Sequence, residues 1–475
     1  MNTGAPWPGL DEAESRVLAM QTKLHQWAAS DADRRFDDVY NLLYDPAFLV
    51  VAWDRVRSNK GAHAAGADGI VPRSIPPGGG EFLAGIAAEL KARRFTPTRV
   101  REKMIPKANG KVRRLGIATA ADRVVQAVLK LVIEPIFEAD FKPCSYGFRP
   151  KRRAQDAIAE IHYLGSPTRN YEWIFEADIT ACFDELSHSA LLERVRYRVK
   201  DKRILGLVKA FLTVGVLCED GVSRDTITGT PQGQILSPLL ANIALSVLDE
   251  HFTRKWEELG PVWTRAKLRR QGVPACRLIR YADDFVVMVW GARGDAEALW
   301  GEVSSVLAPI GLRLSAEKTR VCHIDEGFDF LGFRIQRRSW KGRTGKRAVY
   351  TYPSKKALAS VMAKVHSITR RRKHRTLADL LRLLNRVLRG WCNYFRHGVS
   401  AQTFSYLDHY TWWRVVGWLR KRHDGLNWGA LHRRHLPGWK IRDGQTEMFR
   451  PQTVAVTRYR YRGTRIPTPW ASNAA

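Results

Sequence analysis

The sequence predicts an α+β fold around an antiparallel sheet, followed by a strongly basic, all-helical region. Up to residue 340, short apolar runs rich in valine and aromatic residues alternate with segments of helical periodicity. Residues 354–425 are helical throughout in pattern. Lysine and arginine total 78 against 47 acidic residues, a formal charge of +31, which favours a polyanionic partner such as nucleic acid.

Composition narrows the class of protein. With 475 residues and 45% hydrophobic content, the chain is expected to be globular, with about two to four domains. The six cysteines lie far apart, which excludes a zinc knuckle or a CxxC redox pair and predicts reduced, mostly buried thiols. The acidic N-terminus has no apolar core and no apolar run reaches the length of a membrane span. We therefore expect a cytosolic protein associated with nucleic acid and without a signal peptide.

The first third of the chain is predicted to be mainly helical. Residues 1–58 have helical periodicity, with apolar residues from Phe36 to Leu43 at a 3.6-residue period, and residues 59–70 form a glycine-rich turn. The segment Met104–Ile117 predicts a hairpin that turns at Asn109 and Gly110. Its basic side chains are interpreted as phosphate contacts, with a solvated surface as the alternative; they are Lys107, Lys111, Arg113 and Arg114.

Two further loops and one helix follow this hairpin. Thr119 with Asp122 predicts a capping box at the start of a helix. The loop Cys144–Pro150 is compact and contains one arginine, Arg149. The segment Thr228–Asn242 begins with turn residues and continues into an apolar helix, and a glycine-containing loop of this kind brings backbone N–H groups close to a phosphate or base.

Three aspartates are candidate metal ligands. Asp283 and Asp284 lie at the predicted turn of a hairpin spanning Leu278–Trp290, and Asp178 lies near the end of the predicted strand Trp173–Ile179. Adjacent carboxylates between apolar strands are costly unless a cation compensates them, and hard cations such as Mg²⁺ prefer oxygen ligands. Two metals between carboxylates catalyse phosphoryl displacement. An ordinary surface turn is the alternative for the pair, and Asp184 is expected to cap the next helix.

The C-terminal third combines basic and aromatic residues. A strand and turn at Gly311–Val321 contain Lys318, and Phe328–Ile335 is predicted to be a strand. The helix that begins after Thr376 presents a face without acids, interpreted as a phosphate-contacting surface: Arg382, Arg386, Arg389, Asn393 and Arg396. In the next helix, Trp412, Trp413 and Trp418 are interpreted as core residues, with base stacking as the alternative.

Taken in order, these segments resemble the reverse transcriptases of group II introns, the intron-encoded maturase family, from about residue 30 to 425. The matching segments are NKGAHAAGADGI, IPKANGKVRRLGIATAADRVVQ, SYGFRP, ADITACFD, TPQGQILSPLLANI, YADDF, LSAEKT, FLGF and LNRVLRGWCNYFRHG. The resemblance implies a right-hand polymerase. Its expected parts are an N-terminal extension (1–58), fingers (59–172), a palm (173–340), an all-α thumb or maturase domain (341–425) and a basic tail that binds DNA (426–475).

The resemblance also implies roles for individual residues. Asp178, Asp283 and Asp284, with the carbonyl group of Ile179, would bind two Mg²⁺ ions. The nucleotide would contact Lys107, Arg113, Arg149, Phe183, Gln232, Gly233 and Lys318. Phe183 stands where the family has a steric gate against a ribose 2′-hydroxyl, and FLGF matches the primer grip. Gln234 and Arg114 depart from the glycine and proline that many members have there.

The implied function is an RNA-directed DNA polymerase that binds its group II intron RNA, assists its splicing and copies it into DNA during retrohoming. Its expected partners are the intron RNA, target DNA, a template-primer and deoxynucleoside triphosphates, and no membrane. The sequence has no HNH endonuclease segment. We therefore expect priming from another source, such as a nascent strand at a replication fork. Two alternatives are a host-adopted reverse transcriptase for repair or defence and a purely RNA-binding splicing factor.

Overall fold

The structure is a computed structural model that describes residues 7–106, 110, 112–218, 223–225, 228–230, 232–339, 347–370, 376–423, 427–463 and 466–471. The predicted hairpin-turn residues Lys107, Asn109 and Lys111 lie outside these ranges. The chain forms two compact units. Unit 1 comprises residues 1–153, 175–321 and 463–475, and unit 2 comprises residues 154–174 and 322–462.

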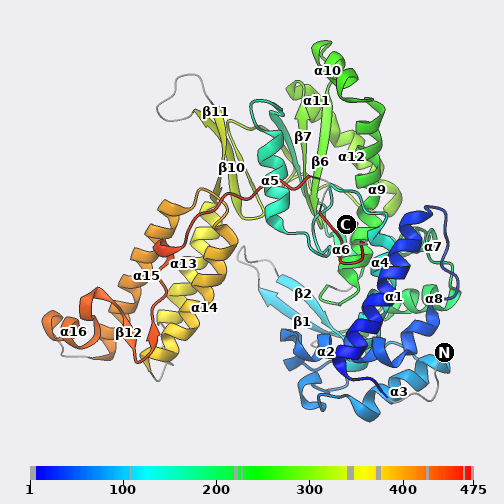
Figure 1. Cartoon of the computed structure of the whole chain (residues 1–475), viewed down its shortest axis with the longest axis horizontal. Helices are drawn as coiled ribbons and strands as arrows, with labels where there is room; N and C mark the ends of the chain where they lie inside the picture. The colour runs from blue at the N-terminus through cyan, green and yellow to red at the C-terminus, as the bar shows by residue number, and fades with distance from the viewer. Residues whose placement is uncertain are drawn as a thin grey trace. The chain divides into compact units, whose positions relative to one another are not determined.

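Three long helices form the N-terminal part of unit 1. Helices α1 (Leu10–Ser30), α2 (Pro46–Ser58) and α4 (Ala120–Glu138) pack against one another (Figure 1). The predicted capping box is present, since the Thr119 hydroxyl accepts the Asp122 backbone N–H at 3.1 Å and donates to its carboxylate. The predicted helical period over Phe36–Leu43 is wrong, because only the 3₁₀ turn η1 (Tyr40–Tyr44) forms there. The Asp201 carboxylate accepts the backbone N–H groups immediately before and at the start of this turn.

The first sheet of unit 1 contains the predicted basic hairpin. Its order is β2-β1-β4-β5, formed by β1 (Val100–Pro106), β2 (Val112–Ile117), β4 (Val216–Leu217) and β5 (Ser223–Arg224). Strands β1 and β2 are antiparallel, with Met104 opposite Arg114, whereas β1 and β4 are parallel. The Arg114 guanidinium lies 3.8 Å from the Glu102 carboxylate. The arginine that stands in place of the family's proline therefore forms an ion pair within the same hairpin.

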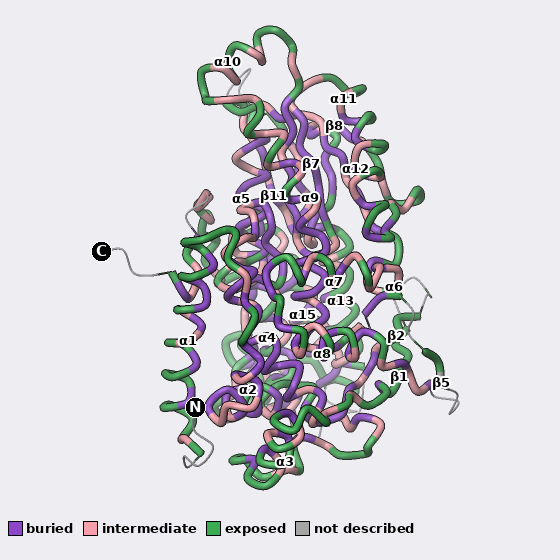
Figure 2. Tube along the Cα trace, turned by 90° about the vertical axis from the view of Figure 1, so that its right-hand side faces the viewer, coloured by how far each residue is buried: buried purple, intermediate pink, exposed green. Residues whose placement is uncertain are grey.

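The second sheet has the order β6-β7-β3-β8 and contains the predicted aspartate hairpin. Strands β6 (Ala275–Tyr281) and β7 (Asp284–Trp290) are antiparallel, from the pair Ala275–Trp290 to the pair Tyr281–Asp284. Residues Phe285–Val289 of β7 are all buried (Figure 2), as expected for a strand in the middle of a covered sheet. Strands β3 (Trp173–Ala177) and β8 (Arg320–His323) contain two of the four points where the chain passes between units; the other two are at 153/154 and 462/463.

Helix α9 (Ser237–Glu258) packs against β6, and α12 (Leu299–Leu307) packs against α9. The remaining elements of unit 1 are η2 (Lys60–His63), η3 (Pro72–Ser74), α3 (Gly80–Lys91), α6 (Cys182–Glu185), α7 (His188–Arg196), α8 (Lys202–Thr213), α10 (Val262–Arg270), α11 (Arg293–Glu297) and η4 (Ala308–Ile310).

Unit 2 combines a three-stranded sheet with a bundle of helices. The sheet has the order β11-β10-β9, formed by β9 (Phe328–Phe330), β10 (Phe333–Ser339) and β11 (Arg347–Pro353). The single strand predicted over Phe328–Ile335 is therefore wrong, because the chain turns at Leu331 and Gly332, where φ is 48° and 80°. The other elements are α5 (Ala154–Leu164), α13 (Lys355–Arg370), α14 (Leu377–Phe395), α15 (Ala401–Arg422), α16 (Trp428–His435), η5 (Pro437–Trp439), β12 (Arg442–Asp443), β13 (Thr446–Glu447) and η6 (Pro451–Thr453).

The helical bundle has the core that the apolar periodicity predicts. Helices α13, α14 and α15 run side by side (Figure 1), and the predicted apolar face of α14 lies in their shared core. Leu380, Leu384 and Leu388 are fully buried there. All six cysteines are buried and none forms a disulfide, as the sequence predicts. Among the described residues, no helix combines the length and apolarity that a bilayer crossing requires.

The basic and aromatic segment 458–462 packs on α5 within unit 2. The Tyr459 hydroxyl donates to Asp156 at 3.0 Å, and Arg462 donates to both oxygens of the same carboxylate at 2.8 Å. Tyr461 stacks on Tyr163 with ring centroids 4.8 Å apart. Within the predicted DNA-binding tail, Tyr459, Tyr461 and Arg462 therefore have partners in the protein itself.

Candidate active site

The two adjacent aspartates lie at the tip of the β6–β7 hairpin, as the sequence predicts. Tyr281 pairs with Asp284, so Ala282 and Asp283 form a two-residue turn. Ala282 has φ of 60°, a backbone conformation that tight hairpins require and that side chains disfavour. The turn places Asp283 outside the ladder and Asp284 at the first position of β7.

Asp178 directly follows β3, the strand beside β7 in the sheet order. Its carbonyl accepts the Ser315 backbone N–H at 2.8 Å, and Ile179 forms a β-bridge with Leu314. The Asp178 carboxylate forms an ion pair with the Lys318 ammonium. Lys318, predicted to contact the nucleotide, therefore lies beside one of the three candidate metal ligands.

The three aspartates interact electrostatically with one another. Desolvation, followed by repulsion from Asp283 and Asp178, raises the pKa of Asp284 to about 6. The pKa of Asp283 is also raised, by desolvation and by repulsion from Asp178, while the Arg113 guanidinium acts in the opposite direction. Because carboxylates at short range disfavour one another's ionised form, this group has excess negative charge that a cation would stabilise.

The donor set fits a hard cation, although its side chains are not gathered into a closed site. Among the residues that the structure describes, no group of three or more His, Cys, Asp or Glu side chains is close enough to bind a metal ion as it stands. The three carboxylates supply the oxygen ligands that Mg²⁺ prefers. Desolvation and, in part, mutual repulsion of the carboxylates raise the pKa values of Asp283 and Asp284, and a bound cation would offset this repulsion.

A pocket of about 440 Å³ lies between β2, helix α6 and residues 228, 230 and 232. It is lined by three of the predicted nucleotide-binding residues, Arg113, Phe183 and Gln232. The Arg113 Nε donates to the Gln232 side-chain oxygen at 2.8 Å. Gly233 has φ of 101° next to this pair, a value that favours glycine.

The loop before α9 is fixed against α6 by backbone contacts. The Thr230 N–H donates to the Phe183 carbonyl at 2.6 Å, and a Cβ at Gly229 would lie 2.4 Å from the same oxygen. Asp184 lines the pocket and does not cap the next helix, because the Ser187 hydroxyl caps α7 instead. Gln234, the departure from the family pattern, accepts a hydrogen bond from Gln126 of α4 at 3.0 Å.

The position of Arg149 contradicts the prediction that it binds the nucleotide. Its side chain is 2% exposed and donates to both oxygens of Glu138, at 2.7 and 2.9 Å. Its remaining N–H groups donate to the carbonyls of Lys142, Ser145 and Phe141. All five donors are therefore used inside the protein, and Arg149 shapes the loop Cys144–Pro150.

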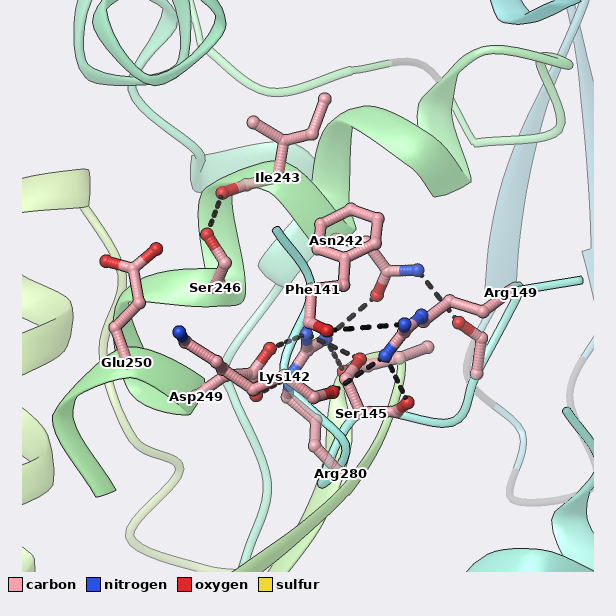
Figure 3. Close-up of polar contacts among 12 residues, drawn as sticks. Phe141, Lys142, Ser145, Arg149, Asn242, Ile243, Ser246, Asp249, Glu250 and Arg280 are labelled. Atoms are coloured by element: carbon pink, nitrogen blue, oxygen red, sulfur yellow. Dashed lines mark hydrogen bonds and ion pairs between the residues drawn. The ribbon is translucent and has the colours of Figure 1, made fainter. Parts of the chain in front are cut away.

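Sequence reasoning missed a second buried arginine, Arg280, which lies with Asn242, Ser145 and Asp249 in one hydrogen-bonded group (Figure 3). Arg280 and Asp249 of α9 are both 0% exposed and form an ion pair. Its Nη1 donates to the Ala282 carbonyl at 3.0 Å and to Asn242 at 2.9 Å, and its Nη2 donates to Ser145 at 2.8 Å. Arg280 thus bonds to the backbone of the turn that bears the aspartates.

The loop Cys144–Pro150 supports the same turn from the other side. Its backbone pairs with Arg280 through two hydrogen bonds, of 2.8 and 2.9 Å. A Cβ at Gly147 would lie 2.3 Å from the Ala282 nitrogen, so only glycine permits this approach. In the sequence, the arginine directly before Tyr281 could have indicated this contact. Its partner Asp249, however, lies 31 residues away in the sequence.

The predicted cationic face of α14 is present in unit 2. Arg382, Arg386, Arg389 and Asn393 are exposed, whereas Arg396 is half-buried. Arg382 forms an ion pair with Asp379 at 2.8 Å, and the Arg389 guanidinium lies 5.4 Å from the Phe449 ring. The stripe remains a predicted RNA contact.

Two family models match the chain. Residues 105–335 match "Reverse transcriptase (RNA-dependent DNA polymerase)" and residues 358–436 match "Group II intron, maturase-specific domain". The chain is 35% identical to Protein YkfC of Escherichia coli, over 72% of this chain and 93% of that protein. It is 27% identical to the group II intron-encoded protein LtrA of Lactococcus lactis, over 86% of this chain and 78% of that protein. It is also 25% identical to nuclear intron maturase 1 of Arabidopsis thaliana, over 49% of this chain and 43% of that protein.

Proposed function

Because the chain belongs to the family of reverse transcriptases and maturases encoded by group II introns, we propose that it copies its own intron RNA into DNA during retrohoming. Its reverse transcriptase domain makes it an RNA-directed DNA polymerase, and its maturase-specific domain assists splicing. The observation that carries the polymerase mechanism is the placement of Asp283 and Asp284 at a rigidly supported turn, electrostatically coupled to Asp178.

In this proposal Asp178, Asp283 and Asp284, with the Ile179 carbonyl, bind two Mg²⁺ ions. Reverse transcriptases use divalent cations, and when bound these ions would lower the pKa of the primer 3′-hydroxyl and neutralise the triphosphate. The carboxylates supply the negative charge that attracts the cations. Lys318 offsets the negative charge of Asp178 and also interacts with Asp284. In this proposal its ammonium group donates to a phosphate oxygen of the nucleotide.

The nucleotide occupies the 440 Å³ pocket in this proposal. Arg113 lines the pocket, and its guanidinium interacts favourably with the Asp283 carboxylate. In this proposal it binds the triphosphate of the incoming nucleotide. The Phe183 ring lines the same pocket, where it acts as the barrier to a ribose 2′-hydroxyl. Gln232 lines the pocket beside Arg113, and Gly233 follows it in the chain. Lys107 lies outside the described residues.

Unit 2 supplies the RNA contact. The exposed face of α14 presents arginines one helical turn apart, a spacing that suits the phosphates of a folded RNA. Its opposite face is buried in the bundle core, so the arginines project from a fixed surface. We assign Arg382, Arg386, Arg389, Asn393 and Arg396 to intron RNA and treat this helical bundle as the thumb.

The test has two arms, one for each activity. The purified protein should extend a DNA primer on an RNA template with deoxynucleoside triphosphates and Mg²⁺, and chelation should stop it. Crosslinking in the native host, followed by sequencing of the bound RNA, should recover one structured RNA that flanks the protein's own reading frame. Reads scattered over many transcripts would instead support a host-adopted reverse transcriptase. A failure to extend any primer would support a splicing factor without polymerase activity.

A further inference from the structure

Three tryptophans of unit 2 are exposed to an unusual degree. Trp413, Trp428 and Trp439 are 50%, 43% and 54% exposed. They contact one another directly or through Trp412, with ring centroids 5.0 to 6.4 Å apart. We call these four residues the tryptophan surface. Large aromatic side chains gathered on the outside of a protein indicate a binding site, because isolated exposure is common but contiguous exposure is not.

The bundle core does not contain the rings of Trp413, Trp428 and Trp439, whereas Trp412 packs against it and is partly buried. Helix α15 buries Val415, Val416 and Trp418, and α16 buries Leu431. Trp413 precedes Trp418 by five residues and therefore points away from the core face of the same helix. The sequence interpretation of these tryptophans as core residues is right for Trp418 and wrong for Trp413.

The surroundings of the tryptophan surface are strongly cationic. From His409 to Arg442 the sequence contains eight lysines and arginines and a single acid, Asp424. On α15, His409, Trp413 and Arg420 follow one another at four- and seven-residue spacing, so they lie along one stripe. Lys440 directly follows Trp439 and is exposed. Protein interfaces are depleted in lysine at their centre, whereas aromatic rings beside cations suit unpaired nucleotides, whose bases stack and whose phosphates need positive charge.

We propose that the tryptophan surface binds unpaired bases of RNA. Bases stack on Trp413, Trp428 and Trp439, and Arg420 and Lys440 contact the intervening phosphates. The assignment to RNA rests on the proposed function, since Trp413 and Trp428 lie within residues 358–436, the maturase-specific match. The surface is separate from the cationic stripe of α14 and recognises exposed bases, whereas the stripe contacts the phosphate backbone.

The experiment measures binding of the full-length protein to a fluorescein-labelled 12-nucleotide oligouridylate by anisotropy, over a range of KCl concentrations. Trp428→Leu and Trp439→Leu should each weaken binding roughly 5- to 150-fold, while Trp428→Phe should largely restore it because the ring face is retained. The matched control is Trp263→Leu, since Trp263 is 72% exposed but belongs to α10 of unit 1. Arg420→Gln should lower the salt slope by about 0.7 without removing a ring.

Several results would overturn the proposal. The first is that Trp428→Leu and Trp439→Leu bind oligouridylate as tightly as the control Trp263→Leu does, and that Arg420→Gln leaves the salt slope unchanged. An equal loss of affinity for duplex RNA would exclude base stacking, and a loss confined to oligothymidylate would make the partner DNA. Loss of self-association in sedimentation, with RNA binding intact, would make the surface a protein interface. Primer extension by the unmodified protein, measured in parallel, decides the proposed polymerase function independently.

Discussion

Arg280→Lys tests whether the buried arginine beneath the aspartate turn positions the catalytic carboxylates. Arg280 donates five hydrogen bonds, and lysine has three donors, so at least two are lost while the charge beside Asp249 is kept. Bonds from a charged donor contribute about 1.5–3 kcal/mol each, so the free energy of unfolding should fall by roughly 3–6 kcal/mol. If the bond to the Ala282 carbonyl is among those lost, kcat should fall about 10- to 150-fold.

The chain contains a matched control in Arg149→Lys. Arg149 is 2% exposed, pairs with Glu138 and also uses five donors, but these reach the aspartate turn only indirectly, through the loop Cys144–Pro150. Its replacement should lower the free energy of unfolding by a similar amount and should lower kcat of the folded fraction less than Arg280→Lys does. The assays are denaturant unfolding and single-turnover primer extension below the unfolding transition. Equal kcat values for the two variants at equal folded fraction would refute a positioning role for Arg280.

Three further predictions concern the site itself. Asp283→Ala should abolish primer extension and leave RNA binding nearly intact, measured by anisotropy; parallel loss of both would mean that the aspartate serves folding. Phe183→Ala should admit ribonucleotides, because the ring lines the pocket; unchanged discrimination in single-nucleotide incorporation would remove Phe183 from the gate. The raised pKa of Asp284, about 6, means that the metal-free folded state binds a proton more tightly than the unfolded chain. That contribution to stability is present at low pH and is lost as the pH rises through about 6, so Asp284→Asn should flatten the melting temperature over this range. Mg²⁺ should raise the melting temperature more at pH 7.5 than at pH 5, and an equal rise would contradict binding at these carboxylates.

Local signals were sufficient for the hairpins and the capping box. The pair of aspartates between two apolar runs predicted the β6–β7 turn, and Thr119 with Asp122 predicted the start of α4, because each depends on residues within a few positions. The same reasoning failed for the strand over Phe328–Ile335, where Gly332 and Leu331 adopt positive φ. There the turn is favoured by packing, since the Tyr394 hydroxyl donates to the Leu331 carbonyl at 2.9 Å.

The buried arginines were beyond sequence reasoning for a physical reason. An arginine in a basic protein is expected to face solvent or phosphate, and burial becomes favourable only when a carboxylate is buried opposite it. Glu138 and Asp249 lie on α4 and α9, and which face of each helix meets the loop or the strand depends on the whole unit. For the same reason, periodicity placed Trp413 and Trp418 on different faces of α15 but did not show which of the two faces the core.

The attachment of residues 459–462 to α5 has a consequence for synthesis of the chain. Asp156 and Glu160 are 2% and 1% exposed in the folded protein, and Arg462, which pairs with Asp156, is translated 306 residues after it. At roughly 5–20 residues per second, the ribosome needs about 15–60 s to supply that partner. Until then Asp156 lacks the two hydrogen bonds from Arg462, so unit 2 cannot complete its packing while the polypeptide is still emerging. A ribosome stalled before codon 459 would therefore hold a chain in which α5 can already contact β11 but lacks the Tyr459 and Arg462 partners of Asp156.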